Sequence, residues 1–155
     1  MTNDGYSPMA WITLTEAHVT ACLSGVELSA WRKAALAPGQ ADPVADALTR
    51  VTNEVRGYIR ASMVGTLDAG NTIPDELLDS AMALVVAKLS TRLPIPLTQE
   101  RKDARDAAMD QLKDVAARRF RLATSLEPAQ DQPGGVELAS GDGQRPTSTQ
   151  LNGLF

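Results

Sequence analysis

The feature that most constrains the fold is an apolar run, residues 81–87, in which every side chain is Ala, Met, Leu or Val. We expect the helix containing it to begin at Pro74 and to stop at Leu93-Pro94. The acids Asp75, Glu76 and Asp79 in its first turns complement the helix dipole. A helix that is apolar nearly all round must be enclosed by other elements or by neighbouring subunits. The run is too short to cross a bilayer.

A second helix is predicted to begin at Asp42-Pro43, an N-cap followed by proline at the first helical position. Apolar side chains then recur at three- and four-residue steps, which predicts one amphipathic face. That face contains Val44, Leu48, Val51, Val55, Tyr58, Ile59 and Met63. The opposite, solvent-facing side is expected to carry Asp46, Arg50, Asn53, Arg56 and Arg60.

A third helix is predicted from the cap Thr98 to about Leu122, with charges of both signs on its outer face. Its apolar stripe is expected to contain Ala108, Met109, Leu112, Val115, Ala116 and Phe120. Three arginines, Arg118, Arg119 and Arg121, cluster near its end. We expect them to complement the helix dipole; the alternative is a contact with an acidic partner or with DNA.

The N-terminal part predicts an irregular lead, residues 1–12, and two short helices. Thr13 and Glu16 have the spacing of a capping box, so one helix should run to about Leu23. After a break at Ser24-Gly25, a second helix should follow over residues 27–37. Together these segments predict an all-α fold, a small bundle of four to five helices over residues 13–123.

The composition changes in residues 124–155, where 18 of 32 residues are Gly, Pro, Ser, Thr or Gln. Such a segment cannot build a core of its own, so we expect an extended C-terminal arm. It holds four acidic residues and one arginine, while the whole chain has a net charge of −4. An acidic chain lacks the broad basic face of a stand-alone nucleic-acid binder.

Residues that carry catalytic chemistry are sparse. The only histidine is His18 and the only cysteine is Cys22, so neither a zinc constellation nor a disulfide is expected. We expect Cys22 to be a small buried hydrophobe. The sequence predicts no catalytic, cofactor-binding or metal-binding residue, and we expect a protein that is not an enzyme.

Several segments resemble the Mu-like prophage neck family, the head–tail connectors or head-completion adaptors of tailed bacteriophages. Asn53-Glu54-Val55-Arg56-Gly57-Tyr58-Ile59 resembles the family's E-hydrophobic-x-G-Y-hydrophobic segment. Ile73-Pro74-Asp75-Glu76-Leu77 resembles its V/I-P-x-x-L segment, and residues 81–93 its apolar helix. Trp11-Ile12-Thr13-Leu14 resembles its start, and Leu97-Thr98 with Ala108, Leu112 and Val115 its last helix. The resemblance covers residues 10–122; residues 61–64 and 85–88 depart from the family pattern.

The resemblance implies a structural virion protein, made in the host cytoplasm and located at the virion neck. Copies of such proteins form a ring, usually of twelve, below the phage portal protein and offer a platform to the next neck or tail-completion protein. Genomic DNA would pass through the lumen without sequence-specific binding, and no membrane is involved. The arm is expected to dock on the portal through Arg145, Leu151, Leu154 and Phe155.

Helix packing or a subunit interface is expected at Val55, Gly57, Tyr58, Leu84 and Val85. Gly57 costs about 1 kcal/mol in mid-helix, which favours a close helix–helix approach; the alternative is a tolerated glycine on an exposed edge. Two other functions stay open. The chain could be a soluble helical regulator or assembly chaperone that binds partner helices through its apolar helix. A helix-turn-helix DNA binder over residues 14–37 is less favoured, because its second helix has only Arg32 and Lys33 as cations.

Overall fold

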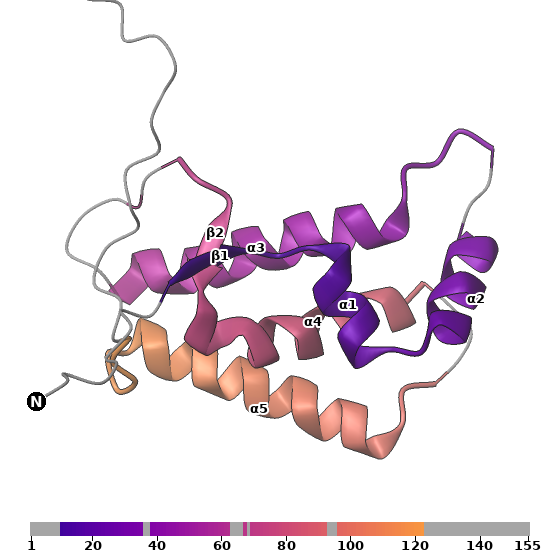
Figure 1. Ribbon diagram of the computed structural model, residues 1–155. Helices are drawn as coiled ribbons and strands as arrows, with labels where there is room; N and C mark the ends of the chain where they lie inside the picture. Colours follow the sequence, from indigo (N-terminus) through magenta and orange to yellow (C-terminus); the bar gives the residue numbers. More distant parts are fainter. Residues whose placement is uncertain (1–9, 36–37, 63–66, 68, 93–95, 123–155) are drawn as a thin grey trace, which may run out of the picture.

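The computed structural model describes residues 10–35, 38–62, 67, 69–92 and 96–122. In these residues five α-helices pack together, and a small two-stranded ribbon lies against the third of them (Figure 1). The helices are α1 (Glu16–Cys22), α2 (Gly25–Ala35), α3 (Pro43–Ser62), α4 (Leu78–Ser90) and α5 (Gln99–Ala116). The strands are β1 (Trp11–Thr13) and β2 (Thr72–Pro74), and a 3-10 turn, η1 (Asp75–Leu77), leads into α4. The predicted all-α helical bundle is confirmed.

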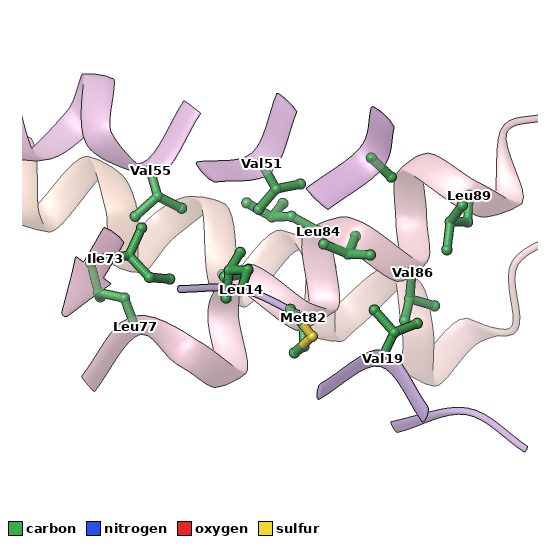
Figure 2. Close-up of a cluster of buried hydrophobic side chains, with 14 of the residues drawn as sticks. Leu14, Val19, Val51, Val55, Ile73, Leu77, Met82, Leu84, Val86 and Leu89 are labelled. Atoms are coloured by element: carbon green, nitrogen blue, oxygen red, sulfur yellow. The ribbon is translucent and has the colours of Figure 1, made fainter. Parts of the chain in front are cut away.

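Helix α4 lies at the centre of the body, packed against α1, α3 and α5 (Figure 1). Six of the seven residues in the apolar run are buried, and only Ala83 keeps partial exposure. Side chains from α3, including Val51 and Val55, and Val19 from α1 meet Leu84, Val86 and their neighbours on α4 (Figure 2). The apolar helix is therefore enclosed by elements of its own chain.

Side chains that cap the helices explain where they begin. Asp42 accepts a hydrogen bond from the Val44 N–H at 3.0 Å, and Thr98 accepts one from the Arg101 N–H at 3.4 Å. Both caps were predicted from the sequence. An Asp or Thr side chain at this position places an acceptor oxygen close to the free N–H groups of the first turn.

The caps of the two short helices differ from the prediction. Thr15, not Thr13, precedes α1, and its N–H donates to Nδ1 of His18 at 3.0 Å. Ser24 forms a capping box with Glu27, since the Glu27 N–H donates to the Ser24 hydroxyl at 3.2 Å and the Ser24 N–H donates to the carboxylate at 3.3 Å. The predicted break at Ser24-Gly25 is thus also the start of α2.

The ribbon of β1 and β2 was not predicted. The strands are antiparallel, with Ile12 opposite Ile73 and Trp11 opposite Pro74. The predicted helix start at Pro74 is therefore wrong: this proline ends a strand, and α4 begins at Leu78 after the 3-10 turn. Proline is tolerated in a two-stranded ribbon because both strands are edges. Strands of three residues are too short to show a period of two in the sequence.

Arg56 was expected on the solvent side of α3, but it is 4% exposed. The helix packs against β2 on this flank, and the guanidinium donates a hydrogen bond to the Thr72 carbonyl at 2.8 Å. The amphipathic pattern indicates only the widest apolar face of a helix. It gives no sign of a second, narrower contact that is made by a polar side chain.

Replacing Arg56 by Ala is expected to lower the free energy of unfolding by about 2–4 kcal/mol, because it empties a buried site and takes this donor away from the Thr72 carbonyl. Urea titration followed by circular dichroism measures the change. The control is Arg60→Ala on the exposed side of the same helix, where a loss within about 0.5 kcal/mol is expected. Equal losses in the two variants would show that the Arg56 contact contributes nothing specific.

Candidate functional site

The four residues predicted to dock on the portal, Arg145, Leu151, Leu154 and Phe155, lie outside the described residues. The described body nevertheless fixes where their segment is attached. The start of β1 and the C-terminal ends of α3 and α5 lie at one end of the body, on the left in Figure 1. Residues 1–9 and residues 123–155 are both joined to the body at this end.

The residues predicted for helix packing or a subunit interface fall into two groups. Val55, Leu84 and Val85 are buried among the helices of a single chain. Val55 and Leu84 point into the core shared by α3 and α4 (Figure 2). These three side chains hold the helices together and present no surface to a neighbouring subunit.

Gly57 and Tyr58 lie at the edge of α3. Gly57 is exposed, and a Cβ atom built there would meet nothing within 4 Å. The expected close helix–helix approach is therefore wrong within the described residues, and the alternative of a glycine on an exposed edge holds. Tyr58 is half-buried and packs against the core.

Helix α5 ends at Ala116, earlier than predicted, because the chain turns sharply at Arg118, whose φ is 60°. The Arg118 N–H donates to the Val115 carbonyl at 2.9 Å and the Arg119 N–H to the Asp114 carbonyl at 2.8 Å. This pair of bonds is the Schellman motif, in which glycine usually takes the left-handed position. Here the Arg118 side chain donates to the Ser62 carbonyl at 2.8 Å and so joins the ends of α3 and α5.

The segment that follows this turn, residues 117–122, is called the α5 terminus below. Phe120 was predicted in the apolar stripe of the helix, but it lies beyond the helix and is 38% exposed. Leu122 packs back against the core. Arg119 is paired with Asp114, whereas Arg121 is exposed and has no ion pair within the described residues. An exposed aromatic residue and a cation without an ion pair in the described residues are therefore neighbours in the sequence.

A groove of about 210 Å³ opens between α1, α4 and α5. Its lining consists of Cys22, Asp79, Met82, Ala83, Val86, Arg101 and Ala104. Met82 and Val86, which are 4% and 8% exposed, belong to the apolar run of α4. The groove is thus the place where the cover over α4 is incomplete.

Charges at the rim of this α1–α4–α5 groove are not balanced. Arg101 is paired with Glu27 at 2.9 Å, and its guanidinium lies 6.0 Å from the centre of the Trp31 ring. Asp79 is exposed and has no ion pair within the described part of the chain. The hydrogen bond from Arg101 and one from the Ser24 N–H lower the pKa of Glu27. The groove therefore combines an apolar floor with one carboxylate that is not neutralised.

Cys22 was expected to be buried, but it is exposed at the edge of the groove. Val19 and Leu23 take the positions of this short segment that face the core. Among the described residues, no hydrogen bond joins Cys22 to His18, whose Nδ1 accepts the Thr15 N–H at 3.0 Å. The sulfur is therefore an accessible thiol without an adjacent base.

Other hollows are polar. One of about 160 Å³ lies between β1 and α3 and is lined mainly by Thr and Asn side chains. Another of about 300 Å³, between α3 and the end of α4, contains Asp46, Arg50, Lys88 and Arg92. Asp46 is paired with both arginines and Lys88 with Glu54, so each of these charged groups has an ion-pair partner.

Arg32 fastens the short helices to the body. Its guanidinium donates to both carboxylate oxygens of Glu16, at 2.7 and 2.6 Å, and to Asp42 at 2.9 Å. The hydrogen bonds from Arg32 lower the pKa of Glu16. Burial raises the pKa of Asp42, but hydrogen bonds from Arg32 and the Val44 N–H outweigh burial, so this pKa is lowered as well. One cation thus connects α1, α2 and the cap of α3.

These shifts predict how stability depends on pH. A carboxyl group whose pKa is lowered by folding stabilises the fold above its unfolded pKa of about 4, and this contribution is lost as the pH falls through the lowered pKa. Arg32→Gln should therefore reduce the free energy of unfolding more at about pH 7 than at about pH 3. Urea titration at both pH values measures the difference, with Lys33→Gln as the control. The same loss at both pH values would contradict the assignment.

Within the described residues, no three or more His, Cys, Asp or Glu side chains are grouped so that they could hold a metal ion. No helix of the described part has the length and apolar character needed to span a membrane. Comparison of the chain with models of known protein families, with curated proteins and with solved structures finds no match.

Proposed function

We propose that the protein is a structural component of a bacteriophage virion, a head–tail connector. Copies of the chain form a ring under the portal, dock on it through the C-terminal arm and extend the DNA channel towards the tail. The main support is that the segments resembling the connector family are the ones that build the core.

Residues from the different segments that resemble the family pack against one another. Val55 and Ile59, from the segment around Gly57 and Tyr58, lie in one buried cluster with Ile73 and Leu77. Leu112, from the segment that resembles the last helix of the family, is fully buried in the same cluster. The segments that resemble the connector family therefore pack together into one core. This agreement favours the connector over a chance collection of short motifs.

The place where the arm is attached also supports the proposal. The arm follows Leu122, at the end of the body where α3 and α5 both finish (Figure 1). Its 32 residues, 124–155, could span about 110 Å if fully extended. A fully extended arm would reach well beyond its own subunit.

The alternative function is a soluble regulator or assembly chaperone that binds a partner helix along the apolar helix. Helix α4 is buried against α1, α3 and α5, so a partner helix would have to displace at least one of them. The groove exposes only part of Met82, Ala83 and Val86. The geometry therefore favours the connector over this alternative.

Deletion of residues 124–155 is expected to leave a folded helical body, because the described core lies entirely before this segment. Binding to the cognate portal should be lost, since the arm carries the proposed docking residues. Circular dichroism checks the fold, and co-sedimentation with purified portal rings checks binding. Normal incorporation of the truncated protein into virions would contradict the proposal.

Point variants locate the contact within the arm. Leu154→Ala and Phe155→Ala are expected to weaken portal binding at least about tenfold, because a few apolar anchors usually dominate such contacts. Leu138→Ala, elsewhere in the same arm, is the matched control and should bind as the unchanged chain does. If all three variants bind alike, the end of the arm is not the anchor.

A further inference from the structure

We propose that the α1–α4–α5 groove binds the α5 terminus of a second copy of the chain, with Phe120 on its apolar floor and Arg121 beside Asp79. The inference rests on the proposed function, because it names the contact between neighbouring subunits of the ring. The observations that carry it are an incompletely covered apolar surface, an exposed aromatic ring and two opposite charges that have no ion pair within the described residues.

The groove leaves part of the apolar surface of α4 open. Met82 and Val86 form the floor with Ala83, and Ala104 provides a small side wall from α5. No large side chain of the described body fills this space of about 210 Å³. The volume suits one aromatic ring, and burying such a ring is a major favourable contribution in protein interfaces.

The α5 terminus offers a matching projection. Among the described residues, Phe120 and Val26 are the large apolar side chains that are exposed, at 38% and 81%. Phe120 follows the turn at Arg118, which is held by backbone hydrogen bonds and by the bond to Ser62. The ring is therefore presented on a fixed backbone, which reduces the conformational entropy lost on binding.

The charges near each residue favour Phe120 over Val26 as the side chain that enters the groove. Arg101 at the groove and Arg119 at the α5 terminus are each neutralised, by Glu27 and by Asp114. Asp79 is then the carboxylate at the groove without an ion pair in the described residues. Of the two α5-terminus arginines that lack an ion pair there, Arg118 is held by the Ser62 carbonyl, so Arg121 is the one placed to reach Asp79. Opposite charges flanking an apolar contact fix its register and exclude other orientations.

The contact cannot form within one chain. Ala104 lies near the start of α5 and Phe120 lies beyond its end (Figure 1). A helix rises 1.5 Å per residue, so Ala104 lies about 18 Å from the end of α5 at Ala116, and Phe120 follows that end. A second copy must supply the ring. Because groove and projection are different patches, repetition of the contact gives a closed ring or an open chain of subunits, unless two copies exchange it reciprocally.

Cross-linking tests the contact directly, since Cys22 lines the groove and is the only cysteine in the chain. In full-length Arg119→Cys, which keeps both Phe120 and Arg121, a short bismaleimide should join position 119 of one copy to Cys22 of the next. We expect a ladder of covalent dimers, trimers and higher species on a denaturing gel. Ala45→Cys, at an exposed site on α3, is the control with the same number of thiols.

Each outcome of the cross-linking bears on the proposal. A ladder supports both the contact and the ring. Covalent dimers without higher species would support the contact as a reciprocal pair, but would contradict the ring. Cross-linking of Arg119→Cys no greater than that of Ala45→Cys would overturn the inference, whatever the portal-binding experiments show.

Charge exchange provides a second measurement in the full-length chain. Asp79→Arg should weaken self-association at least about tenfold, measured by light scattering across a dilution series. Adding Arg121→Asp to this variant should restore association, because the pair is re-formed with its signs reversed. Failure of the double variant to recover, with helix content unchanged, would also overturn the inference. Portal binding of the single variant is scored separately, so loss of the subunit contact and loss of the proposed function are distinguishable.

Discussion

The structure depends on the burial of α4. A helix with apolar side chains on nearly every side needs cover in every direction, and three other helices provide it. The long helices α3 and α5 cover most of its length, and the short helix α1 covers part of the remaining side. Helix α1 has only seven residues, so its cover ends at Cys22 and leaves the groove. The incomplete cover of one helix thus creates the surface that we assign to a neighbouring subunit.

Short helices bury little apolar surface, and ion pairs supplement their attachment. Helix α2 places Leu28 and Trp31 in the core and adds two charged contacts. Arg32 connects it to α1 and to the cap of α3, while Glu27 connects it to Arg101 on α5. Partly exposed pairs of this kind each contribute little to stability, but a network fixes the orientation of an element. The position of α2 and the charge balance at the groove therefore have a common origin.

The sequence predicted the elements whose pattern extends over many residues. The three long helices were recognised from the apolar face of α3, the apolar run of α4 and the stripe of α5, with the caps at Asp42 and Thr98. Features that depend on contacts between distant segments were missed. The three-residue strands are too short to show a period, and Arg56 gave no sign that β2 would cover it.

The candidate site was less predictable than the fold, for a related reason. Phe120 continues the apolar spacing of α5, and the sequence offered no glycine where the chain turns at Arg118. Cys22 and Asp79 were predicted as a core residue and as a dipole-complementing acid. Their place at one groove follows only from how α1, α4 and α5 pack. Among the residues predicted for helix packing or a subunit interface, Val55, Leu84 and Val85 pack in the core between the helices.

The central claim is that this helical body is a ring subunit that docks on a portal. Electron microscopy of the full-length protein mixed with its cognate portal tests the claim most directly. The connector account predicts a ring stacked coaxially on the portal, with the C-terminal arm in contact with the portal surface. A monomer that leaves the portal unoccupied at saturating concentration would contradict it and would favour the helical regulator or chaperone.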